Sequence, residues 1–164
     1  MFLDVTMMIE RKLALIDKFQ RLSAAFDDTL RLEKEVVLFR PFSDSWSIIE
    51  QVVHCVDFDI ANFHRYRWGI VSPGTTVLSF DGTWTSILDY QASELSLAIN
   101  TIKAVRHFMA SHLKRIVDSD WSKCGYTFGD GKGFNLEQAL QHFISHVGFH
   151  RELIDRNVKL FSQT

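Results

Sequence analysis

Cysteine, proline and glycine are all scarce in this chain of 164 residues, which contains 2 cysteines, 2 prolines and 8 glycines. So few helix-breaking residues leave long uninterrupted stretches, which favours long helices over many turns. The two cysteines form no disulfide framework, because Cys55 falls in a predicted helix and Cys124 in a predicted loop. We interpret both as free thiols.

Long apolar runs are also missing. No stretch approaches the ~20 consecutive apolar residues that span a bilayer. The start of the chain, Met1-Phe2-Leu3-Asp4, has no basic segment followed by an apolar one, the pattern that directs secretion. We therefore expect a soluble cytoplasmic protein with no membrane partner.

Charge of one sign is not concentrated anywhere in the chain. Lys and Arg number 18 against 20 Asp and Glu, the formal net charge is −2, and no basic run is longer than a pair. Nucleic-acid binding depends on a concentrated basic surface that neutralises phosphates. The sequence therefore predicts no nucleic-acid partner.

Hydrophobic residues are plentiful, at 46% of the chain, so we expect one core and a single domain over residues 1–164. Apolar residues recur at helical spacing in four segments, about 3–32, 46–68, 85–117 and 136–161. Asp44 or Ser45 can cap the second helix, and Asn135, with Gln138 three residues later, can cap the fourth. The glycine-rich linker 119–134 predicts a short hairpin. Four helices of ~25 residues predict an all-α fold, a four-helix bundle.

Three histidines at steps of four, His142, His146 and His150, lie in the last predicted helix. Residues four apart are neighbours on a helix, about 6 Å apart along its axis, so two such imidazoles can bind one metal ion. A projection at about 100° per residue places His146 and His150 inside the apolar face and His142 at its edge. Two buried neutral imidazoles need partners, and a shared cation satisfies both.

A third nitrogen ligand must come from another helix, and His54 in the second predicted helix is the best candidate. It lies one turn after Glu50 and beside Asp57, off the middle of the apolar face, which favours a cleft there. Either carboxylate could accept a hydrogen bond from the ring or act as a further ligand. We expect the side chains of the remaining histidines to be exposed to solvent and not to bind the metal: His64, His107 and His112.

The pattern Trp46-Ser-x-x-Glu50-x-x-x-His54, followed late in the chain by Leu136-Glu137-Gln138 and then His146-x-x-x-His150-Arg151, resembles the DinB/YfiT-like family. The resemblance covers most of the chain and implies a four-helix bundle with up-down-down-up connections, often a homodimer. It also implies a divalent metal held by His54, His146 and His150. Zinc or nickel is the first expectation for this metal, and iron is an alternative.

Three nitrogen ligands leave at least one metal position open, as in catalytic zinc sites. Some family members are S-transferases or isomerases that use low-molecular-weight thiols, so the resemblance implies a metal-dependent, thiol-dependent S-transferase. A metal-dependent hydrolase and a non-catalytic bundle that binds a metal, a ligand or a partner remain alternatives. No catalytic residue is identified, because many members have a glutamate directly after the first histidine of the last helix and Val147 stands there in this chain.

Overall fold

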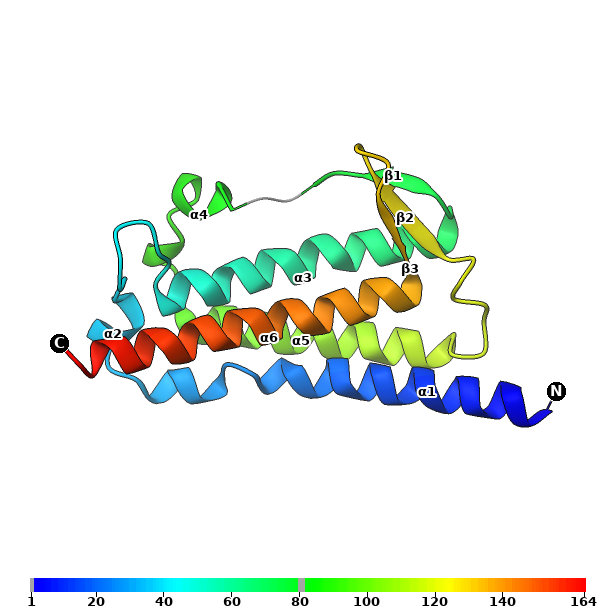
Figure 1. The fold of residues 1–164 in the computed structure, drawn as a ribbon, viewed down its shortest axis with the longest axis horizontal. Helices are drawn as coiled ribbons and strands as arrows, with labels where there is room; N and C mark the ends of the chain where they lie inside the picture. The colour runs from blue at the N-terminus through cyan, green and yellow to red at the C-terminus, as the bar shows by residue number, and fades with distance from the viewer. Residues whose placement is uncertain (1, 80–81) are drawn as a thin grey trace.

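A computed structural model describes residues 2–79 and 82–164 of the chain. Four long helices lie side by side in Figure 1: α1 (Phe2–Arg21), α3 (Ile48–Val71), α5 (Leu95–Arg115) and α6 (Leu136–Phe161). The remaining described elements are short: η1 (Leu22–Ala24), η2 (Asp27–Arg31), α2 (Lys34–Leu38), β1 (Thr75–Val77), α4 (Trp84–Ile87), η3 (Tyr90–Ala92), β2 (Gly125–Phe128) and β3 (Gly133–Asn135).

The four long helices form the predicted bundle with up-down-down-up connections. In Figure 1, α1 and α6 run in one direction along the bundle, and α3 and α5 run in the other. Helices α1 and α3 each pack against both α5 and α6. Because α3 and α5 are consecutive long helices with the same direction, the chain between them must return along the bundle, and its described parts lie near both ends of α3.

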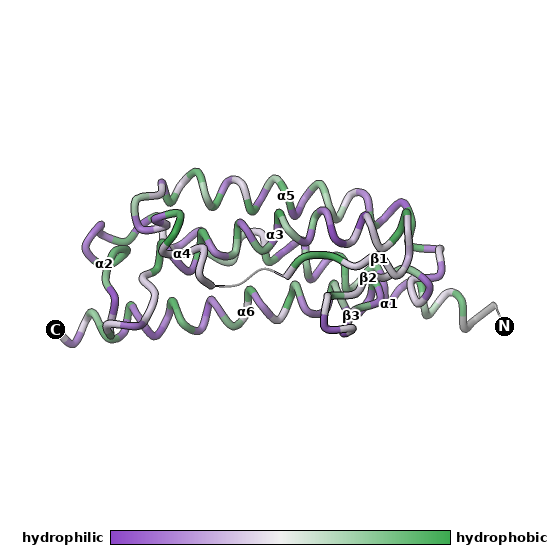
Figure 2. Tube along the Cα trace, turned by 90° about the horizontal axis from the view of Figure 1, so that it is seen from above, coloured by the Kyte–Doolittle hydropathy of each residue, from purple (hydrophilic) through white to green (hydrophobic). Residues whose placement is uncertain are grey.

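Amphipathic helices build the core. Figure 2 shows apolar and polar residues alternating along the long helices, the pattern of a helix with one buried face. The buried apolar side chains form two clusters, one around Phe19, Phe143 and Trp121 and the other around Phe26, Ile48 and Val147. Among the described residues, no helix has the length and apolar character needed to cross a membrane.

A buried ion pair joins three of the helices. Arg106 on α5 donates through Nε to Asp59 of α3 at 2.5 Å, and both side chains are at most 1% exposed. The same guanidinium donates to the main-chain oxygen of Phe143 on α6 at 3.4 Å. Breaking such a pair leaves an uncompensated buried charge. The pair therefore fixes how α3, α5 and α6 sit against one another.

Two predicted helix boundaries are wrong. The first helix ends at Arg21 rather than near residue 32, and the chain continues in two 3-10 turns. There Thr29 donates through its hydroxyl to the main-chain oxygen of Phe26 at 2.6 Å, a local bond that competes with helix formation. The third long helix begins at Leu95 rather than near residue 85. Asp89, just before η3, has a φ of 46°, which an α-helix cannot contain.

The two long helices that carry the selected histidines begin at capping boxes. Asn135 caps α6 together with Gln138, as predicted. The cap of α3 is Ser47, so the prediction of Asp44 or Ser45 is wrong. The main chain of Ser47 donates to Glu50 Oε2 at 2.8 Å, and its hydroxyl accepts from the main chain of Glu50 at 3.4 Å. Of Asp44, Ser45 and Ser47, Ser47 is the residue with a glutamate three positions later, and this glutamate completes the reciprocal hydrogen bonds of the capping box.

The predicted hairpin is present as the antiparallel pair β2 and β3. The backbones approach so closely that a Cβ added to Gly133 would lie 2.3 Å from the main-chain oxygen of Tyr126. A third strand, β1, pairs with β2 in parallel, with Thr75 opposite Tyr126. The sequence did not predict β1, since three residues carry too little periodicity to identify a strand.

Candidate metal centre

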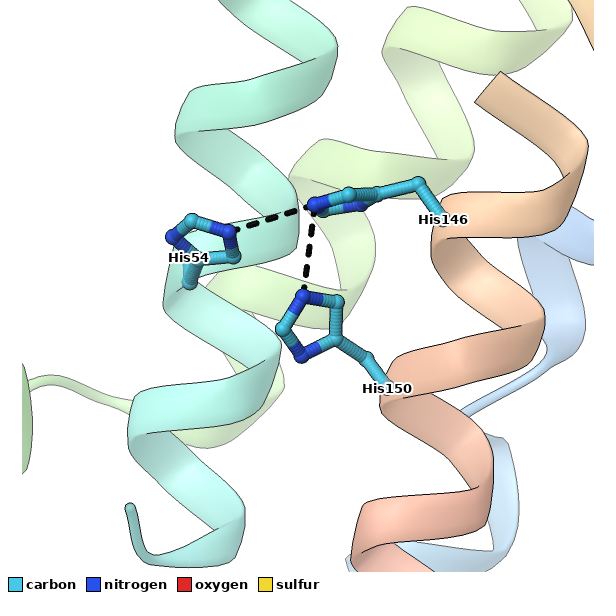
Figure 3. Close-up of side chains that lie close together, drawn as sticks. All are labelled: His54, His146 and His150. Carbon is cyan, nitrogen blue, oxygen red and sulfur yellow. Dashed lines mark hydrogen bonds between the residues drawn. The ribbon is translucent and has the colours of Figure 1, made fainter. Parts of the chain in front are cut away.

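Three histidines from two helices converge inside the bundle. Figure 3 shows His54 on α3 facing His146 and His150 on α6. The Nε2 atom of His146 lies 3.2 Å from Nε2 of His54 and 3.3 Å from Nε2 of His150. One nitrogen from each ring falls within 4.8 Å of the other two. The structure therefore brings together the three residues selected from the sequence.

Helix packing places these side chains. The cap at Asn135 fixes where α6 begins, and burial of Phe143, Val147 and Ile154 fixes which of its faces turns inward. His146 and His150, one turn apart, then lie on the side that packs against α3. His54 is 8% exposed and His150 is 4% exposed, whereas His146 is half-buried.

Aromatic rings hold the imidazoles in place. Phe58 stacks on His146 with ring centres 3.5 Å apart and planes within 5° of parallel. Trp46 lies parallel to His150, with ring centres 6.2 Å apart, and its ring centre is 4.9 Å from that of His54. These contacts restrict the orientation of each imidazole.

Gln51 sets the tautomer of His150. Its Oε1 atom accepts a hydrogen bond from Nδ1 of His150, so the lone pair of that ring is on Nε2 and points into the cluster. Gln51 was not among the residues selected from the sequence. The available signal was its position three residues before His54 on the buried side of α3.

The two carboxylates considered as partners of His54 are engaged elsewhere. Glu50 belongs to the capping box and accepts a hydrogen bond from Nε of Arg40 at 2.9 Å. Asp57 accepts a hydrogen bond from the hydroxyl of Tyr90. Gln51 is the side chain that accepts from His150, and a supporting role of Glu50 or Asp57 toward His54 stays a prediction.

Burial keeps the three imidazoles neutral. It lowers the pKa of His54 to about 4 and that of His150 to about 3. The pKa of His146 falls to about 2, first because of burial and then because of the neighbouring histidines and Arg106. Neutral imidazoles offer the lone pairs that a metal ion requires.

The cluster fits a divalent metal. A neutral ring nitrogen carries either one proton or one lone pair, so Nε2 of His146 cannot form full hydrogen bonds with both neighbours. Its Nδ1 atom is buried and has no hydrogen-bond partner among the described residues. Metal–nitrogen bonds of 2.0–2.1 Å in a tetrahedral site separate the ligand nitrogens by about 3.3 Å, close to the 3.2 and 3.3 Å found here.

A cavity of about 610 Å³ opens beside the histidine cluster. This volume lies within the range of small-molecule sites. Its wall combines the three histidines with aromatic, apolar and charged side chains: Phe42, Asp44, Ser45, Trp46, Gln51, Phe149, Leu153 and Arg156. A molecule held in this cavity would lie against the cluster.

The other four histidines lie outside the cluster. His142 is exposed and stacks on Phe134, with ring centres 5.1 Å apart, so its predicted place at the edge of the buried face is correct. His64 and His107 are also exposed, whereas His112 is half-buried and lies 3.2 Å from the hydroxyl of Tyr66. The prediction of a solvent-exposed side chain is therefore wrong for His112.

Fold and site together define a helical bundle with a three-histidine cluster suited to a divalent metal. The family model of the DinB superfamily matches residues 16–154, and the chain belongs to this superfamily. Its fold is also that of a solved structure described as "YfiT from Bacillus subtilis is a probable metal-dependent hydrolase with an unusual four-helix bundle topology". The two share 16% identity and a TM-score of 0.85, over 93% of this chain and 89% of YfiT. No curated protein matches the chain.

Proposed function

We propose that this chain is a divalent-metal-dependent enzyme for small molecules, with His54, His146 and His150 as the metal ligands. The observation that carries the proposal is the convergence of three neutral ring nitrogens in the wall of a cavity of about 610 Å³. A structural zinc site is closed by four protein ligands, whereas three ligands beside a cavity leave room for substrate.

The surrounding side chains prepare this site. Gln51 fixes the tautomer of His150, and Trp46 and Phe58 hold the ring planes. When bound, a divalent metal acts as a Lewis acid and favours the deprotonated form of a thiol or water. Zinc or nickel is our proposal for the metal and iron is the alternative, because imidazole ligands accept all three.

Thiol-dependent transfer is the proposed reaction. The thiol loses its proton to solvent, its sulfur forms a bond to an electrophilic carbon, and the leaving group departs with the electron pair of the broken bond. The surroundings of the cluster support this choice. Val147 is buried in the core, and Glu50 and Asp57 are engaged by other groups. A thiol, with an ordinary pKa near 8.5, needs a general base less than water does.

Hydrolysis is the second candidate. It is favoured by the fold shared with YfiT, which is described as a probable metal-dependent hydrolase. The same three ligands and the same cavity could serve a metal-activated water. The homodimer, the thiol partner and the cytoplasmic location stay predictions.

Cobalt substitution tests the proposed reaction. Glutathione, bacillithiol or mycothiol added to the cobalt protein is expected to shift the visible d–d bands and add a sulfur-to-metal charge-transfer band. Transfer of the thiol to an electrophile should require metal and should be lost in His146→Ala. The matched control is His142→Ala, one turn away and outside the cluster, which should behave like the wild type.

Three outcomes separate the candidates. A charge-transfer band together with metal-dependent transfer supports the transferase. An unchanged spectrum with every thiol, combined with metal-dependent cleavage of esters or amides, overturns the transferase in favour of the hydrolase. Bound metal without turnover in either screen overturns both enzymes and leaves a bundle that only binds metal or ligand.

A further inference from the structure

The cavity beside the histidine cluster has an apolar wall that folding does not explain. Phe42 is 57% exposed and Phe149 is 56% exposed, yet both line the cavity together with Trp46 and Leu153. Exposed aromatic side chains gathered at one cavity indicate contact with a ligand. The wall therefore fits a molecule with an apolar body.

Arg156 lies in line with this wall. Phe149, Leu153 and Arg156 follow one another at steps of four and three residues, so they share one ridge of α6. Arg156 comes six positions after His150, which is about 9 Å along the helix axis. A ligand that reaches from the histidines to Arg156 therefore passes along the apolar ridge.

The guanidinium of Arg156 is oriented and available. It donates to Oδ1 of Asn157 at 3.1 Å, and Asn157 is buried and donates to the main-chain oxygen of Trp46 at 2.7 Å. Among the residues that the structure describes, no carboxylate forms an ion pair with Arg156. A planar guanidinium in this state suits a carboxylate, which it can bind through two parallel hydrogen bonds.

The charges at the cavity favour an anion. Arg156 and a divalent metal at the histidines are positive, whereas Asp44 is the one acidic residue in the described lining. Asp44 is exposed, in the short loop before α3. A metal ion is the largest local charge in such a site, so the cavity attracts negative groups overall.

We propose that the substrate of this site has an apolar body with a carboxylate at its far end, and that Arg156 binds this carboxylate. The proposal rests on the proposed function, because the histidine cluster holds the reacting end of the substrate. Arg156 then determines specificity, and Phe42, Phe149 and Leu153 contact the apolar body.

Calorimetry with the matched ligands phenylbutyrate and phenylbutanol tests the proposal. Wild-type protein, both zinc-loaded and metal-free, should bind the carboxylate about tenfold more tightly than the alcohol. Arg156→Gln should abolish this preference, and Asp44→Asn should increase it. Lys159→Gln removes a charge from an exposed position of α6 outside the cavity and should leave the preference unchanged.

Two results would overturn the proposal. Equal affinity for the two ligands, or no binding of either, excludes the proposed substrate class while metal-dependent turnover stays intact. A preference that survives in Arg156→Gln but disappears without metal shows that the carboxylate binds the metal instead of Arg156. Failure of the proposed function is distinguishable, because the metal-free protein would keep its carboxylate preference although no turnover is found.

Discussion

Replacing Gln51 with leucine should weaken metal binding without removing a ligand. Gln51 is 2% exposed, and its amide oxygen accepts the Nδ1 proton of His150. When Nε2 of His150 binds a metal, the ring must carry its proton on Nδ1. In Gln51→Leu that buried proton loses its acceptor in the metal-bound state, whereas the metal-free ring can change tautomer or rotate.

The size of the effect follows from this asymmetry. A buried donor without a partner is destabilised by about 1–3 kcal/mol. At about 1.4 kcal/mol for each factor of ten, the dissociation constant for zinc should rise about 5- to 140-fold. This range includes the roughly 10- to 100-fold loss that is typical when a partner of a ligand histidine is removed. The three ligand nitrogens stay in place, so one metal per chain should still bind at saturation.

Competition with a chromophoric chelator measures this change. Gln51→Glu keeps an acceptor for the Nδ1 proton and should retain most of the affinity. Gln141→Leu makes the same replacement at an exposed position of α6 and serves as the control. Wild-type zinc affinity in Gln51→Leu would refute the role assigned to this hydrogen bond.

Two further predictions concern the histidines. Elemental analysis should find about one divalent metal per wild-type chain and no metal in the double variant His146→Ala/His150→Ala. The control His142→Ala should keep its metal, and full metal retention in the double variant would exclude the site. The three cluster histidines have pKa values of about 4, 2 and 3 in the folded protein, below the unfolded value near 6.5. The unfolded state therefore binds more protons below pH 6.5, so metal-free protein should become less stable as pH falls from 6.5 toward 4, by up to about 1.4 kcal/mol per pH unit for each histidine. Thermal melts of the metal-free wild type and of the metal-free double variant His146→Ala/His150→Ala measure how stability changes with pH. Equal pH dependence in the two proteins would contradict the neutral state of the two rings.

The sequence determined the features that depend on local spacing. A helical period of apolar residues identified four helices, and the i, i+4 relation put His146 and His150 on one buried face. Asn135 and Gln138 identified the start of α6 because a capping box needs only residues three positions apart. The family resemblance supplied the connection order of the bundle, and His54 was selected on its position in the second helix.

Only the tertiary structure decided the features that depend on distant contacts. Apolar spacing continues past Arg21 and begins before Leu95, so it could not show where the helices α1 and α5 end and start. The bond from His150 to Gln51 joins residues 99 positions apart, and the pairing of Thr75 with Tyr126 joins two strands that are short on their own. Side chains such as Gln51 acquire their role when α3 packs against α6, because packing determines which polar group faces which ring. Periodicity along one helix carries no information about that partner.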